Sequence, residues 1–179
     1  MADYLNPTVI QPTIPPHCMT PLERLLLTRM FAWETDNGEY YFFAEDSPNN
    51  ELTIETKDLR AAIAASKEHP SSALSTIVEQ LSGCEPEEQT LYLDLSSISW
   101  EAILQDVLRH NPQIPYITAI TSFACTKMRP DGFGGMAVLI TAEAIRGKST
   151  HDVLEELLEE GEVGPFEPAS KSNEDQNNV

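Results

Sequence analysis

The stretch TAITSFACTKMRPDGFGGMAVLITAEAI, from Thr118 to Ile145, decides the fold. It contains two runs of apolar and β-branched residues on either side of the loop Arg129–Gly135, whose sequence is RPDGFGG. Such runs favour strands, and glycines supply the positive φ angles that a turn between strands needs. The stretch therefore predicts a β-hairpin at the centre of a sheet, extending from about Tyr116 to Ala142.

A second hairpin is predicted upstream, where aromatic runs flank Asn37 and Gly38. Asn-Gly readily adopts the positive φ angles of a tight turn, so residues 31–35 and 39–44 are predicted to pair as antiparallel strands. Residues 51–55 are a candidate for a third, short strand. Residues 91–95 alternate between apolar and polar side chains, which is typical of a strand with one buried face. The chain therefore contains enough strands for one sheet.

Helical spacing of apolar residues predicts five helices. The first begins at the capping box Thr20-Pro21-Leu22-Glu23 and ends near Thr28. The next three cover residues 57–67, residues 72–82 and the segment from Ser99 to Asn111. The last follows Ser149 and Thr150, and its apolar residues are expected to face the core: Val153, Leu154, Leu157 and Leu158.

Strands clustered in hairpins and separated by helices predict an α+β fold. We expect a mainly antiparallel sheet of about five strands, two hairpins plus one or two single strands, with helices mostly on one face. Residues 1–19 contain four prolines, which favour an extended arm over a helix or strand. Residues 20–161 form one predicted α+β domain, and the polar residues 162–179 are a predicted disordered tail.

The charge of the chain excludes some classes of function. It carries 29 acidic and 11 basic residues, which gives a net charge of −18. Direct binding of nucleic acid needs many Lys and Arg contacts to phosphate, and anionic membranes attract basic segments, so neither is an expected ligand. No Lys or Arg occurs in 30–56, 68–108 or 149–170. Between Lys127 and Lys148 the basic residues outnumber the two acidic ones, Asp131 and Glu143: Lys127, Arg129, Arg146 and Lys148.

The ends of the chain and its cysteines predict a cytoplasmic location. The first residues lack the basic and apolar regions of a secretory signal, and no apolar run has the roughly 18 residues of a membrane-spanning helix. The three cysteines, Cys18, Cys84 and Cys125, are an odd number at wide spacing. This spacing fits neither a disulfide framework nor a Cys-x-x-Cys metal site, so we expect reduced thiols packed as small apolar side chains.

The loop Arg129–Gly135 offers one alternative function. Its Arg-x-x-Gly-x-Gly spacing, formed by Arg129, Gly132 and Gly134, resembles the phosphate-binding motif of the acetyltransferase superfamily that uses acetyl-coenzyme A. The resemblance implies a small enzyme or binding domain that holds an anionic cofactor on backbone N–H groups at a helix N-terminus. The motif in that family precedes a helix, whereas the β-branched residues 136–141 predict a strand.

No catalytic, cofactor-binding or metal-binding residues are predicted. The four histidines, His17, His69, His110 and His151, lie far apart in the sequence without the helical spacing of zinc ligands. The sequence also lacks a Gly-x-Ser-x-Gly elbow and a Walker-type loop. These features favour a non-enzymatic protein that needs no cofactor.

We expect the chain to bind a protein partner that is basic. Rows of carboxylates present a phosphate-like field to a basic surface and steer association with it. Inhibitors, immunity proteins and nucleic-acid mimics use this physics. The residues predicted to contact the partner are those of the last helix and of the loop, where Phe133 is a plausible exposed anchor: Arg129, Asp131, Phe133, Glu155, Glu156, Glu159 and Glu160.

Overall fold

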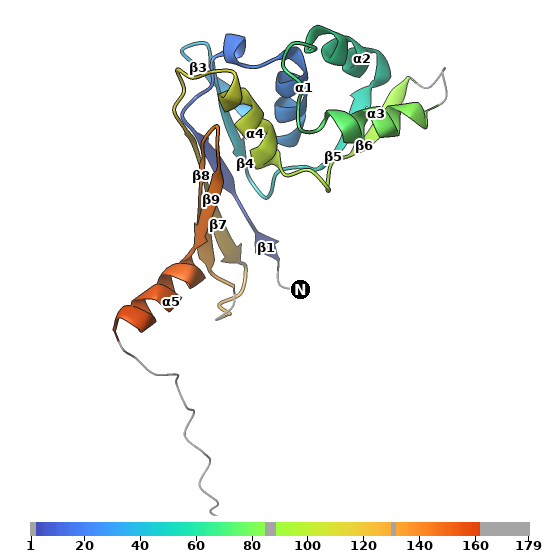
Figure 1. The fold of residues 1–179 in the computed structure, drawn as a ribbon. Helices are drawn as coiled ribbons and strands as arrows, with labels where there is room; N and C mark the ends of the chain where they lie inside the picture. The colour runs from blue at the N-terminus through green and yellow to red at the C-terminus, as the bar shows by residue number, and fades with distance from the viewer. Residues whose placement is uncertain (1–2, 85–88, 130–131, 162–179) are drawn as a thin grey trace, which may run out of the picture.

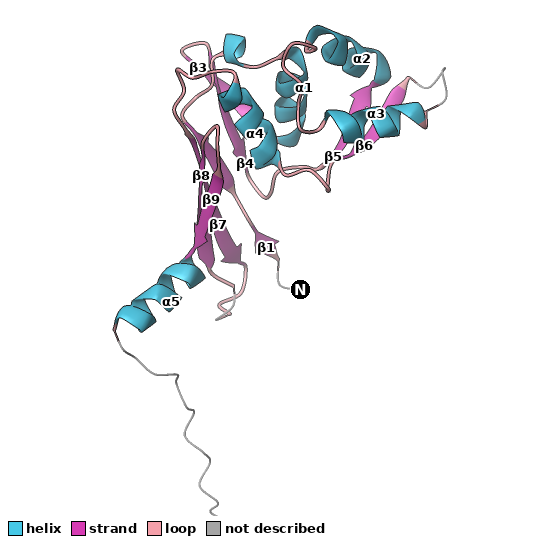
Figure 2. Ribbon diagram, viewed as in Figure 1, coloured by secondary structure: helices cyan, strands magenta, loops and turns pink. Residues whose placement is uncertain are grey.

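The structure is a computed structural model that describes residues 3–84, 89–129 and 132–161 (Figure 1). The predicted tail, 162–179, and Asp131 lie outside these ranges. The described residues form an α+β fold whose main sheet is antiparallel, as the sequence predicts. Figure 2 shows all the longer helices except the last gathered around one end of the long strands, with a small second sheet among them.

The main sheet has seven strands, more than the sequence predicted. Six of them follow the order β3-β4-β2-β7-β8-β9, and β1 pairs with the end of β7. All the pairings between these strands are antiparallel. Their bounds are β1 Tyr4–Leu5, β2 Thr8–Gln11, β3 Ala32–Asp36, β4 Glu39–Ala44, β7 Ile117–Cys125, β8 Gly134–Ile140 and β9 Ile145–Ser149.

Strand β2 lies inside the sheet, where no strand was predicted. It pairs with β4 on one side and with β7 on the other, with Val9 opposite both Phe43 and Ile120. The interpretation of residues 1–19 as an arm without a strand was therefore wrong. Pro7 precedes β2 and the other three prolines follow it, so none interrupts the strand, and Ile10 within β2 is a buried core residue.

Both predicted hairpins are present. In the turn between β3 and β4, Asn37 has φ 51° and Gly38 has φ 85°, the left-handed angles that this dipeptide adopts easily. The central hairpin is formed by β7 and β8, with Ala119 opposite Val138. Its loop glycines were expected to supply positive φ angles, which was wrong, because Gly38 is the only described glycine with a positive φ. Strand β9 extends it by a third strand that the sequence did not predict, because Arg146, Gly147 and Lys148 lack the apolar alternation of a buried strand.

Helices α1 (Pro21–Met30) and α4 (Trp100–Arg109) lie against one face of the sheet. The predicted capping box is present, because Thr20 and Glu23 exchange hydrogen bonds between side chain and backbone. Strand residues that point to this face are buried with the helices and form the core. They include Ile10, Phe42, Ile117, Ala119, Val138 and Ile140, which pack with Leu22, Leu26, Leu27, Ile103, Leu104 and Val107.

The remaining elements form a second layer beside α1. Strands β5 (Glu51–Glu55) and β6 (Thr90–Asp94) pair as a separate two-stranded sheet, and α2 (Thr56–Ala65) and α3 (Leu74–Ser82) pack around it. A short 3-10 helix, η1 (Pro16–Cys18), links β2 to α1. None of the helices in the described ranges combines the length and the apolar composition that crossing a membrane requires.

The last helix, α5 (Thr150–Glu160), begins at Ser149 as predicted but does not pack as predicted. Val153, Leu154, Leu157 and Leu158 were expected to face the core, and all four are exposed. The helix extends away from the end of the sheet that lies farthest from α1 and α4 (Figure 1). Amphipathic spacing predicts a helix and its apolar side, but it does not tell whether the chain itself covers that side.

Candidate protein-binding surface

The structure brings the central loop and the start of α5 together. Ser149 caps α5 through a capping box with Asp152, and Gly135 N–H donates a hydrogen bond of 3.2 Å to Thr150 Oγ1. Gly134 lies so close that a Cβ atom on it would be 2.8 Å from the same oxygen. The glycines of the loop therefore allow α5 to start directly against β8.

This contact gives a testable role for Gly134. Replacing Gly134 with alanine should destabilise the chain by about 1–3 kcal/mol, because the added methyl group overlaps Thr150 Oγ1. Either Thr150 must turn away from Gly135 N–H, which loses a hydrogen bond, or α5 must shift. Gly147→Ala is a matched control on β9, where the nearest atoms would be 3.6 Å away, an ordinary contact. Urea unfolding measures both, and equal stabilities of the two variants would contradict the role of the close approach.

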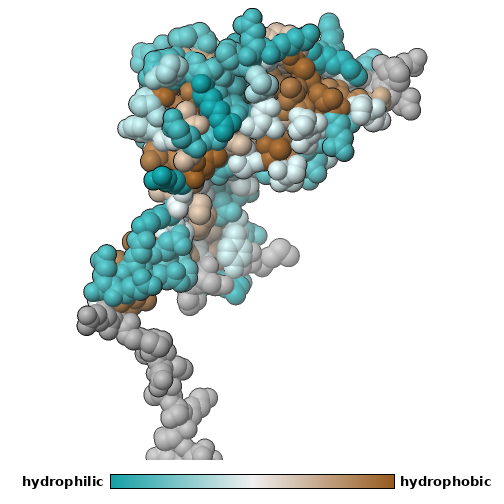
Figure 3. Space-filling model, viewed as in Figure 1, coloured by the Kyte–Doolittle hydropathy of each residue, from teal (hydrophilic) through white to brown (hydrophobic). Residues whose placement is uncertain are grey.

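One side of α5 is an uncovered apolar row, defined as Val153, Leu154, Leu157 and Leu158. These side chains are 43 %, 53 %, 58 % and 43 % exposed, and none of the 11 residues of the helix is buried. In the view of Figure 3 the hydrophilic side of α5 faces the reader, and apolar residues are visible at its margins. Four large apolar side chains on one exposed helix are typical of a surface that another molecule covers.

The opposite side of α5 is the acidic row, Glu155, Glu156, Glu159 and Glu160, all exposed. Glu155 Oε1 lies 3.2 Å from His151 Nε2, and Glu156 Oε2 lies 2.5 Å from Nζ of Lys148 on β9. Glu159 and Glu160 form no ion pair with any residue that the structure describes. Two of the four carboxylates are therefore available to a basic group from outside.

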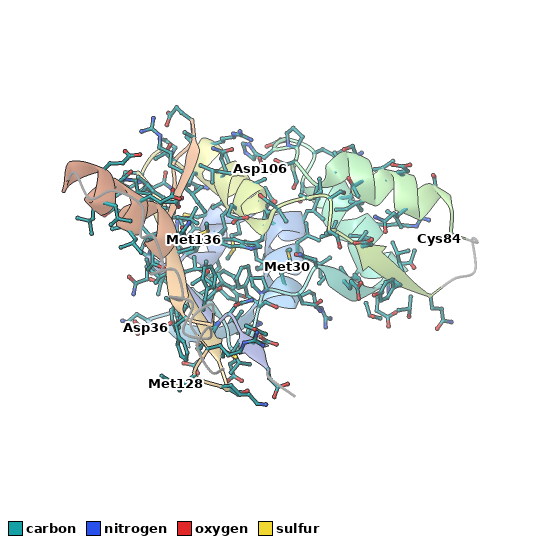
Figure 4. All side chains as sticks on the ribbon, turned by 90° about the horizontal axis from the view of Figure 1, so that it is seen from below. Met30, Asp36, Cys84, Asp106, Met128 and Met136 are labelled. Atoms are coloured by element: carbon teal, nitrogen blue, oxygen red, sulfur yellow. The ribbon has the colours of Figure 1, made fainter. Side chains whose placement is uncertain are left out.

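The loop adds apolar residues at the same end of the sheet. Phe133 is 50 % exposed and Met128 is 91 % exposed, and Figure 4 labels Met128 at the loop and Met136 on the following strand. Arg129 is on the surface as well. Gly134 and Gly135 are the first two residues of strand β8, so they do not begin a helix as in the acetyltransferase motif.

A second cluster of side chains was missed by sequence reasoning. Three of the four histidines, His17, His69 and His110, line one cavity of about 300 Å³ between η1, the start of α1, the end of α2 and the end of α4. The rings of His69 and His110 stack with centroids 4.5 Å apart. No spacing in the sequence signals this cluster, because each histidine comes from a different turn or helix end.

Glu23 lies next to this cavity and is fully buried. Its Oε2 accepts a hydrogen bond of 2.8 Å from Thr20 N–H and lies 3.4 Å from His110 Nε2, whereas Oε1 has no hydrogen-bond partner. Burial away from water raises the pKa of Glu23 to about 7, and the negative charge of Asp106 adds to the increase. Glu23 can therefore gain or lose a proton near neutral pH.

The cluster combines three histidines with a buried carboxyl group whose pKa is raised to about 7. The described residues contain no group of three or more His, Cys, Asp or Glu side chains that could hold a metal ion. Cys18, which follows His17, is buried, and its carbonyl oxygen accepts a hydrogen bond of 2.6 Å from Asn111. Glu23 also has a structural role, because its side chain completes the capping box of α1 with the N-cap residue Thr20.

The predicted partner-binding residues are thus partly brought together. Phe133 and the acidic row lie at the same end of the sheet, joined through the contact between Gly135 and Thr150. The apolar row of α5, on the other side of the helix from the acidic row, was assigned to the core but is exposed. Comparison of the chain with protein-family models, with curated proteins and with solved structures finds no match.

Proposed function

We propose that the chain is a non-enzymatic interaction protein that binds a basic protein partner through α5. The observation that carries the proposal is the exposure of the whole helix, with four large apolar side chains on one side and four glutamates on the other. No residue of α5 is buried, so packing within the described chain leaves about half of each side chain in the apolar row uncovered. Binding to another protein would cover that half.

The two sides of α5 indicate the shape and the charge of the partner's binding surface. An apolar row on an amphipathic helix fits a hydrophobic groove, and burying the exposed half of each side chain contributes roughly 1 kcal/mol. The acidic row would face the rim of that groove, where Lys or Arg side chains can pair with Glu159 and Glu160. Charge at the rim speeds association and selects the partner, while the apolar contacts supply most of the affinity.

A basic groove of this kind is typical of proteins that bind nucleic acids or acidic peptides. The chain would compete with those ligands as an inhibitor, an immunity protein or a nucleic-acid mimic, consistent with its net charge of −18. We also propose a cytoplasmic location. In support, Cys18, Cys84 and Cys125 form no disulfide, as is usual in a reducing compartment.

The test uses the full chain as bait in an extract of the organism that encodes it, with mass spectrometry of the captured proteins. We expect one basic protein, whose binding to the purified chain weakens as salt rises from about 0.05 to 0.5 M, because salt screens exposed charges. Leu157→Asp should abolish binding, and the pair Glu159→Lys and Glu160→Lys should weaken it at least tenfold.

The matched control is Glu79→Lys, which changes an exposed glutamate on α3. This variant should bind as the unchanged chain does. The proposal is wrong if the captured protein binds equally well to the Leu157→Asp chain, or if its affinity is the same at both salt concentrations. A stabilising thermal shift with acetyl-coenzyme A would favour the cofactor-binding alternative instead.

A further inference from the structure

The main sheet has one face that no described helix covers. Side chains alternate along each strand, so residues next to the buried ones point away from α1 and α4. On β7, Ile117 and Ala119 are buried whereas Ile120 is 50 % exposed, and on β8 Val138 is buried whereas Leu139 is 42 % exposed. We call the side opposite the helices the open face.

The centre of the open face is apolar. The strand register aligns Phe43, Val9, Ile120 and Ala137 in one row across β4, β2, β7 and β8. Tyr41 stacks beside Phe43 with ring centroids 5.5 Å apart, and Leu139 occupies the next row. An apolar band across four strands of an antiparallel sheet is the usual inner face of a two-sheet sandwich.

Opposite charges lie at the two edges of the open face. Glu34 and Asp36 are at the β3 edge, in register with Tyr41 and Glu39. Arg146 and Lys148 are at the β9 edge, in register with Leu139 and Ala137. Within the ranges that the structure describes, neither Glu34 nor Arg146 has an ion-pair partner.

The acidic edge also borders a groove of about 940 Å³. Its walls include Glu34, Asp36, Tyr41 and Tyr116, together with the prolines at positions 12 and 115, and no basic residue lines it. Carboxylates and tyrosine rings both attract a guanidinium or ammonium group. The groove is therefore suited to a cationic side chain that arrives from outside.

We propose that the open face binds the open face of a second copy of this chain, which forms a two-fold symmetric dimer. In a two-fold dimer the same surface of both copies forms the interface. The apolar band of one copy can then cover that of the other, and each charged edge can meet an edge of opposite charge. Arg146 of each copy then faces Glu34 of the other, at the mouth of the groove.

The charge pattern selects the symmetry axis. If the two-fold axis runs parallel to the strands and between the two sheets, the β3 edge of one copy meets the β9 edge of the other. If the axis runs across the strands, each β3 edge meets its own equivalent, and like charges are opposed. The first arrangement also keeps the strands of both sheets roughly aligned at a spacing of about 10 Å, as in sandwiches. At about 0.15 M salt, screening limits the repulsion between the two acidic chains.

Sedimentation velocity of the full chain at about 0.15 M salt tests the proposal. The unchanged chain should sediment as a dimer, and Ile120→Asp and Leu139→Asp should each convert it to a monomer. Val78→Asp on α3, at a side chain that is 49 % exposed but away from the sheet, is the matched control and should remain dimeric.

A charge exchange tests the orientation of the two copies. The Arg146→Glu chain alone and the Glu34→Lys chain alone each oppose like charges at both contacts, so each should be at least tenfold weaker as a dimer. Mixed together, they restore both contacts and should form a heterodimer. A monomeric unchanged chain, a dimeric Ile120→Asp chain, or a mixture that does not associate would each overturn the proposal.

Discussion

As the pH rises from about 5 to about 8, the free energy of unfolding of the Glu23→Gln variant is expected to increase by about 3 kcal/mol relative to that of the unchanged chain. Burial raises the pKa of Glu23 from 4.5 to about 7 in the folded chain. The unfolded chain therefore loses this proton first, and the folded state loses stability progressively between about pH 4.5 and pH 7. Glutamine has no proton to lose and can still accept the hydrogen bond from Thr20 N–H.

The measurement is urea unfolding of both chains at several pH values. Only the difference between the two free energies of unfolding matters, because the other carboxylates titrate alike in both. Glu79→Gln, which changes an exposed glutamate, should show a difference that does not vary with pH. A difference for Glu23→Gln that is equally constant would mean that the Glu23 carboxyl titrates in the folded chain as it does in water.

Replacing Asp106 with alanine is expected to destabilise the chain by about 3 kcal/mol at neutral pH. The side chain of Asp106 on α4 is 5 % exposed and accepts hydrogen bonds from Ser72 N–H at 2.5 Å, from Ser72 Oγ at 2.8 Å and from Arg109 Nη1 at 2.8 Å. Alanine would leave the Ser72 amide without its acceptor. This contact holds the loop before α3 against α4.

Asp106→Asn separates the loss of hydrogen bonds from the loss of charge. Its amide oxygen can still accept from Ser72 N–H, so a smaller loss of about 1 kcal/mol is expected. Urea unfolding compares both variants with Glu79→Ala on α3, which should change stability by less than about 0.5 kcal/mol. If Asp106→Ala is no more destabilising than Glu79→Ala, the loop before α3 is held by its apolar contacts alone.

Most elements of the fold were predictable because their signals are local. The turn at Asn37-Gly38 and the caps at Thr20, Ser99 and Ser149 each depend on residues within one turn of the chain. Strand β2 was not predictable in this way. Its four residues are too few to show a period, and pairing partners more than 100 residues away hold it in place.

The candidate site was harder to predict because its key property is an absence of contacts. Leu154 and Leu157 have the spacing of core residues, and nothing in the sequence says that α5 leaves the body of the molecule. The convergence of His17, His69 and His110 was equally hidden, since it requires η1, α2 and α4 to be placed relative to one another. Local patterns specify which side of an element is apolar, and tertiary packing decides what covers it.

The central position of β2 has a consequence for synthesis on the ribosome. Its neighbour β7 is separated from it by 107 residues, as in the pairing of Gln11 with Thr118. During synthesis β4 becomes available to pair with one edge of β2 first. The other edge of β2 stays unpaired until β7 leaves the ribosome. The main sheet can therefore close only after β7 has been synthesised, and removing residues 8–11 would take out an inner strand between β4 and β7.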